Sequence, residues 1–167
     1  LWRAMTVGLS LLALALGGCG PAAIPNNLAD DSERANSFLG DLVAELPDDA
    51  KAEYERRARS IEQDLKTELN QAAGAQNVTV NLSDYVDRRL GAINRLKGSI
   101  EAVSHSLSGK AGNAAPQQNQ ALDDFAKNSL KVQLALALRE RWLNQHYLEL
   151  AVDKDKAVAE AFRRWGK

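Results

Sequence analysis

Apolar side chains recur every three or four residues through most of the chain beyond residue 30, and this spacing predicts helices that are buried along one face. The longest pattern lies near the C-terminus and forms a near-heptad seam: Leu122, Phe125, Ser129, Val132, Leu136, Leu143, Tyr147 and Leu150. A second apolar edge runs beside this seam: Leu130, Leu134, Leu138 and Trp142. Because a helix with so wide an apolar surface is usually enclosed by others, we expect it to be central in a bundle. A break is expected at Asp153–Lys156, before a short helix over 157–165, unless the two form one long helix.

The first helix of the domain is expected to begin at Asp30 or Asp31 and to end at Pro47. Asp30 and Glu33 have the spacing of a capping box, and proline cannot continue a helix. Between these limits the apolar positions form one stripe: Ala35, Phe38, Leu39, Leu42, Val43 and Leu46. Either of the two aspartates after Pro47 can cap a second helix, which is expected to end at Gly74.

The stretch Asn77–Leu82 alternates polar and apolar residues and has no partner strand elsewhere, so it is expected to be an extended connector. Ser83 can then cap a third helix. The apolar seam of that helix consists of Val86, Leu90, Ile93, Leu96, Ile100, Val103 and Leu107. The run Gly109–Gln120 is rich in glycine, asparagine and glutamine and is expected to be a loop. These elements together predict an all-α domain over residues 30–167, an antiparallel bundle of four to five helices.

The charge of the chain argues against a nucleic-acid partner. Lys and Arg number 21, Asp and Glu number 22, the net charge is −1, and the two signs are interleaved. Phosphate binding needs a basic excess or a basic stripe, so no nucleic acid is expected as a partner. The chain has a single cysteine, which excludes an intramolecular disulfide, so the domain must be held together by packing.

The N-terminal residues have the form of a secretory signal. Arg3 supplies a positive charge, and an apolar run follows over Val7–Leu16. Ten helical residues extend about 15 Å, half the hydrocarbon core of a bilayer, so the run is too short for a stable membrane span. It fits the apolar region of a signal peptide instead.

The residues that follow, Leu16-Gly17-Gly18-Cys19, resemble the lipobox of bacterial lipoproteins, in which an aliphatic residue and two small residues precede a cysteine. The resemblance implies cleavage between Gly18 and Cys19, a diacylglycerol on the thiol and an acylated new N-terminus. Several acyl chains on one residue give stable attachment to a bilayer, whereas one chain binds only marginally.

By this resemblance the chain has three parts: a signal peptide over 1–18, a lipidated cysteine with a flexible tether over 19–29, and the helical domain over 30–167. Gly20 stands where lipoproteins retained in the inner membrane often have aspartate, which favours the outer membrane. The domain is therefore expected in the cell envelope, facing the periplasm, with the lipid bilayer as a partner through acylated Cys19.

No catalytic, metal or cofactor site is expected. His105 and His146 are the two histidines, and antiparallel packing is predicted to separate them by about 36 Å. Zinc needs three or four converging ligands. The sequence contains neither the Gly-x-Ser-x-Gly elbow of serine hydrolases nor a glycine-rich phosphate loop. We therefore do not expect an enzyme.

Aromatic and basic residues near the C-terminus are the candidates for binding a partner. They are Trp142, Phe162, Arg163, Arg164 and Trp165. Trp and Arg dominate the hot spots of protein interfaces, which favours a docking surface. For Trp142 and Phe162, however, the favoured interpretation is that they fill the core while the arginines face water; for Trp165 the two interpretations are balanced.

These features favour a non-enzymatic interaction module for an envelope protein, in assembly or secretion. Helical pilotins, which escort secretin subunits to the outer membrane, are an example of this role, but they carry a disulfide that this chain cannot form, so membership of that family is not supported. The alternatives are a periplasmic helical chaperone or stress sensor, whose usual Leu-Thr-x-x-Gln repeats are absent, and a hydrolase with an unrecognised site. The oligomeric state stays open, a homo-oligomer included.

Overall fold

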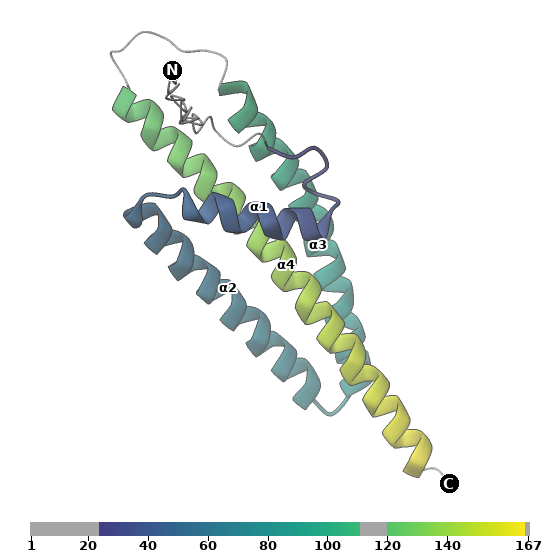
Figure 1. Ribbon diagram of the computed structural model, residues 1–167. Helices are drawn as coiled ribbons and strands as arrows, with labels where there is room; N and C mark the ends of the chain where they lie inside the picture. The colour runs from purple at the N-terminus through teal and green to yellow at the C-terminus, as the bar shows by residue number, and fades with distance from the viewer. Residues whose placement is uncertain (1–23, 111–119, 166–167) are drawn as a thin grey trace, which may run out of the picture.

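The computed structural model describes residues 24–110 and 120–165, of which residues 110, 120, 161, 162 and 165 are described by their backbone alone. These residues form four helices (Figure 1): α1 (Ser32–Ala44), α2 (Asp48–Gly74), α3 (Val78–Lys110) and α4 (Gln120–Trp165). The predicted all-α bundle is confirmed, with four helices in the described ranges. α3 runs antiparallel to both α2 and α4, and α1 crosses α4 obliquely.

α4 is the helix around which the others pack. α1, α2 and α3 all contact it. Its middle turns are therefore buried on most of their circumference, at Val132, Leu134, Ala135, Leu136, Ala137 and Leu138. This confirms the prediction that the C-terminal apolar pattern belongs to the central helix, because only a helix enclosed on several sides buries residues at consecutive positions.

α4 is one uninterrupted helix of 46 residues, so the expected break at Asp153–Lys156 is absent and the alternative of one long helix is correct. The sequence from 120 to 165 contains no glycine and no proline, the residues that most strongly end a helix. Four consecutive charged residues are compatible with a helix whose surface faces water. Asp153 and Lys156 form an exposed pair one turn apart, at 3.7 Å.

The expected connector at Asn77–Leu82 is wrong, because α3 begins at Val78 and continues through Ser83. The backbone N–H of Asn81 donates to the carbonyl oxygen of Asn77 at 3.0 Å, closing the first turn. Val78 and Leu82 are four residues apart and face the bundle, with Leu82 fully buried, while Val80 is 61% exposed. Apolar residues at alternate positions thus fit a helix as well as a strand, and burial of Leu82 selects the helix.

The predicted seams of the two long helices are only partly buried. Ile100 is fully buried on α3 and Leu143 on α4, but Leu90, Leu122 and Phe125 are exposed. Figure 1 shows the reason for the last two: the first turns of α4 extend beyond the start of α2 and beyond α1. The sequence pattern therefore continues past the point where the neighbouring helices cover it.

The segment before α1 packs on the bundle, although the sequence predicted a tether through residue 29. Leu28 and Ala29 are buried. Their turn is closed by Asn27, which has a φ of 64°, a conformation that asparagine adopts more readily than most residues. Arg141 of α4 donates to the carbonyl oxygen of Leu28 at 3.4 Å. The packed part of the chain thus begins before residue 30.

The N-terminus of α1 is capped by Asp31, one of the two expected positions. Its carboxylate accepts a hydrogen bond from the backbone N–H of Arg34 at 3.0 Å. Asp30 does not form the expected capping box; its side chain pairs with Lys97 of α3 instead. The pair ties the start of α1 to a helix that is distant in sequence.

The hydroxyl of Tyr85 on α3 is buried between helices and donates to the carbonyl oxygen of Leu65 on α2 at 3.2 Å. Burial, which disfavours the phenolate, raises the pKa of Tyr85 to about 12; nearby Arg89 opposes this change and Glu68 adds to it. The pKa values of the other two tyrosines, Tyr54 and Tyr147, are also raised by burial.

We expect the free energy of unfolding to fall by roughly 2–3 kcal/mol between pH 10 and pH 12 on account of Tyr85. The stabilisation is complete below the unfolded pKa of 10.0 and is lost as the pH rises through the folded value of about 12. Urea unfolding across this range measures it. Tyr85→Phe should flatten the decline by that amount, and an unchanged decline would contradict the burial of this hydroxyl.

Candidate functional site

Trp142 lies between two side chains of its own helix. The guanidinium of Arg139 is 4.6 Å from the centre of the indole, and the imidazole of His146 stacks on it with ring centres 5.4 Å apart and an angle of 7° between the planes. Arg139 is in turn paired with Glu62 of α2 at 3.4 Å. Positions three and four residues apart share one face of a helix, which explains the stack. The indole is therefore held in place before any partner binds.

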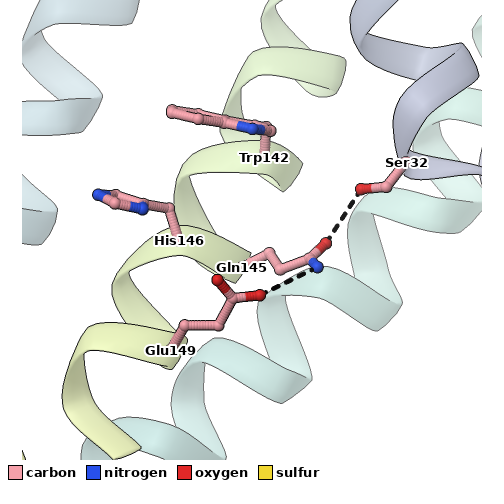
Figure 2. Close-up of a pocket in the computed structure, with 5 residues that line it drawn as sticks. All are labelled: Ser32, Trp142, Gln145, His146 and Glu149. Atoms are coloured by element: carbon pink, nitrogen blue, oxygen red, sulfur yellow. Dashed lines mark hydrogen bonds between the residues drawn. The ribbon is translucent and has the colours of Figure 1, made fainter. Parts of the chain in front are cut away.

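A shallow hollow adjoins this stack, at the point where the start of α1 meets α4. It has a volume of about 160 Å³ and is lined by Ser32, Trp142, Gln145, His146 and Glu149. Figure 2 shows Trp142 and His146 on one side and Ser32 on the other. The Ser32 hydroxyl donates to Oε1 of Gln145 at 3.2 Å, and Nε2 of Gln145 donates to Glu149 at 3.3 Å.

The polar groups that line the hollow bond to one another. The hydroxyl of Ser32 donates to an amide and not to an imidazole, so Ser32 and His146 do not form a nucleophile–base pair. Pockets for small molecules usually enclose about 300–1,000 Å³, which is larger than this hollow. Its size suits one side chain of a partner, with an aromatic wall and an amide and a carboxylate for hydrogen bonds.

A second group of polar side chains lies inside the bundle, where α2, α3 and α4 meet. Arg89 donates to Glu68 at 2.9 Å and to Oδ1 of Asn144 at 3.2 Å. Asn144, which is fully buried, donates to the backbone oxygen of Glu140 at 2.8 Å. Burial raises the pKa of the Glu140 carboxyl, and the nearby charges of Arg89, Arg57 and Arg95 oppose this. These groups bond to one another, which fits a structural role.

The structure separates the residues that the sequence grouped as a docking surface. Trp142 is half-buried, and Arg163 and Arg164 are exposed at the end of the same helix, about 30 Å further along at 1.5 Å per residue. They do not form one patch with Trp142. The side chains of Phe162 and Trp165 lie outside the described residues, as do Gly18 and Cys19.

The two histidines are exposed on different helices. Arg89 of α3 donates to Asn144 of α4, so these two positions lie side by side. His105 lies 16 residues beyond Arg89, and His146 lies two residues beyond Asn144 in the opposite direction. The two histidines are therefore roughly 27 Å apart along the bundle, closer than predicted. Across the described ranges, no three His, Cys, Asp or Glu side chains are placed to hold a metal ion.

Sequence reasoning grouped Arg139 with Trp142 among the aromatic and basic residues near the C-terminus, but it did not place His146 or Ser32 beside the indole. His146 was recognisable, because it lies four residues after the tryptophan. Ser32 was not, because it is 113 residues from Gln145 in the sequence. Only the crossing of α1 over α4 brings the two together.

None of the described helices is long and apolar enough to cross a membrane. Comparisons with protein-family models, with curated proteins and with solved structures found no match for this chain.

Proposed function

We propose that this protein is a lipid-anchored, non-enzymatic interaction module that binds an envelope protein on the periplasmic side of the outer membrane. The observation that carries the proposal is the sequence Leu16-Gly17-Gly18-Cys19 directly after a short apolar run, with the only cysteine of the chain at the position to be acylated. Attachment through several acyl chains makes the membrane location stable.

The start of the packed domain supports this proposal. Ile24 already contacts the core cluster, and Leu28 is buried. Five residue steps separate Cys19 from Ile24, at most about 17 Å of extended chain. An acylated Cys19 would hold the domain against the membrane, where a partner in the same membrane is within reach.

The stack at Trp142 supports the interaction role. An indole fixed between Arg139 and His146 loses little conformational freedom on binding, which lowers the cost of forming a contact. The adjoining hollow offers a side-chain-sized cavity with polar groups at its rim. Aromatic anchors beside such cavities are typical of binding hot spots.

Replacement of Cys19 by serine tests the anchor. In cells grown with an alkyne-tagged fatty acid, we expect the native protein to carry the tag and to fractionate with the outer membrane. Cys19→Ser should lose the tag and the membrane association completely, because serine cannot accept the thioether-linked lipid. A native protein without the tag would show that the lipoprotein assignment is wrong.

A photo-crosslinking residue at Gln145 tests the interaction role in the same cells. We expect a discrete adduct from this position, absent from a crosslinker at exposed Ser106 of α3 and lost in Trp142→Ala. The loss follows because the indole forms one wall of the hollow. Equal adducts from both positions, or an adduct that survives Trp142→Ala, would contradict binding at this surface.

A further inference from the structure

Two large apolar side chains are exposed at the start of α4. Leu122 is 66% exposed and Phe125 is 74% exposed. They are three residues apart and so lie on one face of the helix. Further along α4, residues of the same seam are buried, at Val132 and Leu136. The helix thus presents a short apolar surface, defined here as the Leu122–Phe125 patch, where its neighbours end.

The N-terminal segment joins the bundle in the same half. Leu28 belongs to one core cluster, against which Ile24 and, on α3, Val103 and Leu107 also pack. Leu82 at the other end of α3 belongs to a separate cluster. Arg141, near the middle of α4, donates to the carbonyl oxygen of Leu28, and Ile24 lies four residues before Leu28. The packing of Ile24 on this cluster therefore places the entry of the chain in the half of the bundle that contains the patch.

The length of the chain before Ile24 limits how far this half can be from the membrane. This step rests on the proposed function, since it requires that Cys19 be acylated. Five residue steps reach at most about 17 Å, whereas α4 alone, with 46 residues, is about 69 Å long. An acylated Cys19 would therefore hold the half of the bundle that contains Ile24 close to the bilayer, whereas the length of α4 allows its far end to lie away from the membrane.

We propose that the Leu122–Phe125 patch inserts into the headgroup region of the bilayer and orients the domain with the start of α4 toward the membrane. An anchored domain meets the surface at high effective concentration, so a weak apolar contact is sufficient. Apolar residues of surface-bound helices lie at the boundary between headgroups and acyl chains. Asp123, which flanks the patch, is paired with Lys127 at 2.8 Å, so its charge is locally balanced.

The opposite end of the bundle provides the internal comparison. Val80 on the first turn of α3 is 61% exposed and also apolar. It lies beside the core cluster of Leu82 and Tyr85, whereas Ile24 packs on the other cluster. Exposure alone would predict the same behaviour for Val80 and Phe125, whereas the anchor predicts membrane contact for Phe125 only.

Fluorescence quenching by lipids tests this orientation. The acylated full-length protein is reconstituted in phosphatidylethanolamine–phosphatidylglycerol vesicles with one new cysteine, either Ala121→Cys beside the patch or Lys154→Cys near the far end of α4, carrying an environment-sensitive dye. Quenchers are attached to the acyl chains of the lipid. We expect the dye at position 121 to shift to shorter wavelength and to lose most of its emission, and the dye at position 154 to do neither.

Substitution of the patch completes the experiment. Leu122→Ser with Phe125→Ser should restore the emission at position 121 while the protein stays bound to vesicles through Cys19, and Val80→Ser should change nothing. Circular dichroism verifies that both variants stay helical.

Equal emission from the dyes at positions 121 and 154, or no response to the serine pair, would overturn the proposed orientation. A wavelength shift without lipid quenching, as in pairing of two copies, would overturn it too. Acylated protein that fails to bind vesicles would disprove the anchor itself.

Discussion

Leu134→Ala should lower the free energy of unfolding by about 3–4 kcal/mol, because it leaves a cavity at the centre of the bundle. Leu134 has no exposed surface and belongs to the core cluster that joins α1, α2, α3 and α4. Several helices enclose the site, so no single one can move to fill the lost volume. Since domains are stable by only about 5–15 kcal/mol, this one change removes a large part of the total.

The matched control is the same substitution on the same helix. Leu122→Ala removes the same atoms from a side chain that is 66% exposed, and we expect a change within about 0.5 kcal/mol. Urea unfolding followed by circular dichroism measures both variants. Equal losses would mean that the start of α4 is as well covered as its middle, and that the patch proposed to face the membrane is not free.

The helices could be predicted from the sequence because each has a repeating apolar face and strong end signals. Pro47 separates α1 from α2, and α2 ends at Gly74 as expected. The central place of α4 followed from the width of its apolar surface. These are local properties, visible in a window of a few turns.

The errors arose where the environment, and not the local pattern, decides. Val78 and Leu82 fit a strand and a helix equally well, and the helix is selected by the surrounding bundle. The burial of Leu28 before α1 depends on contacts with helices that come together only in the folded bundle. Phe125 looked like a core residue for the same reason. The sequence does not reveal that the first turns of α4 extend beyond the start of α2, and Phe125 is exposed.

The candidate site was less predictable than the fold. Trp142 was identified by its residue type, but grouped with arginines that lie about 30 Å away once α4 is continuous. The contact between Ser32 and Gln145 joins residues from the two ends of the domain. Such long-range pairings leave no periodic trace in a single sequence.

The buried polar group around Asn144 could not be predicted either, and it leads to the second large effect. Asn144→Ala should lower the free energy of unfolding by about 2–3 kcal/mol. The change removes the acceptor for Arg89, a charged donor whose side chain is only 12% exposed, and hydrogen bonds to charged groups are worth about 1.5–3 kcal/mol. Arg89 keeps Glu68 and its position over the Tyr85 ring, so the loss is limited.

Asn94→Ala on α3 is the control for this variant. Asn94 is exposed, so the change only improves helix propensity and should stabilise the protein by a few tenths of a kcal/mol. Relative to the native protein, the urea midpoint should therefore fall for Asn144→Ala and rise slightly for Asn94→Ala. A midpoint for Asn144→Ala equal to or above that of the native protein would show that the amide contributes nothing to the bundle.

A double-mutant cycle separates the pair from its surroundings. Arg89→Met leaves Oδ1 of Asn144 buried without its donor. Asn144→Ala leaves Nη1 of Arg89 without the acceptor that Asn144 supplied. Each single change therefore includes a penalty for the group left behind. The double variant incurs neither penalty. We expect its loss to be smaller than the sum of the single losses by about 1–2 kcal/mol, whereas strictly additive losses would mean that the two residues act independently. A coupling of this size would indicate that this group helps to fix the register of α3 against α4, which in turn determines where the start of α4 lies relative to the segment before α1.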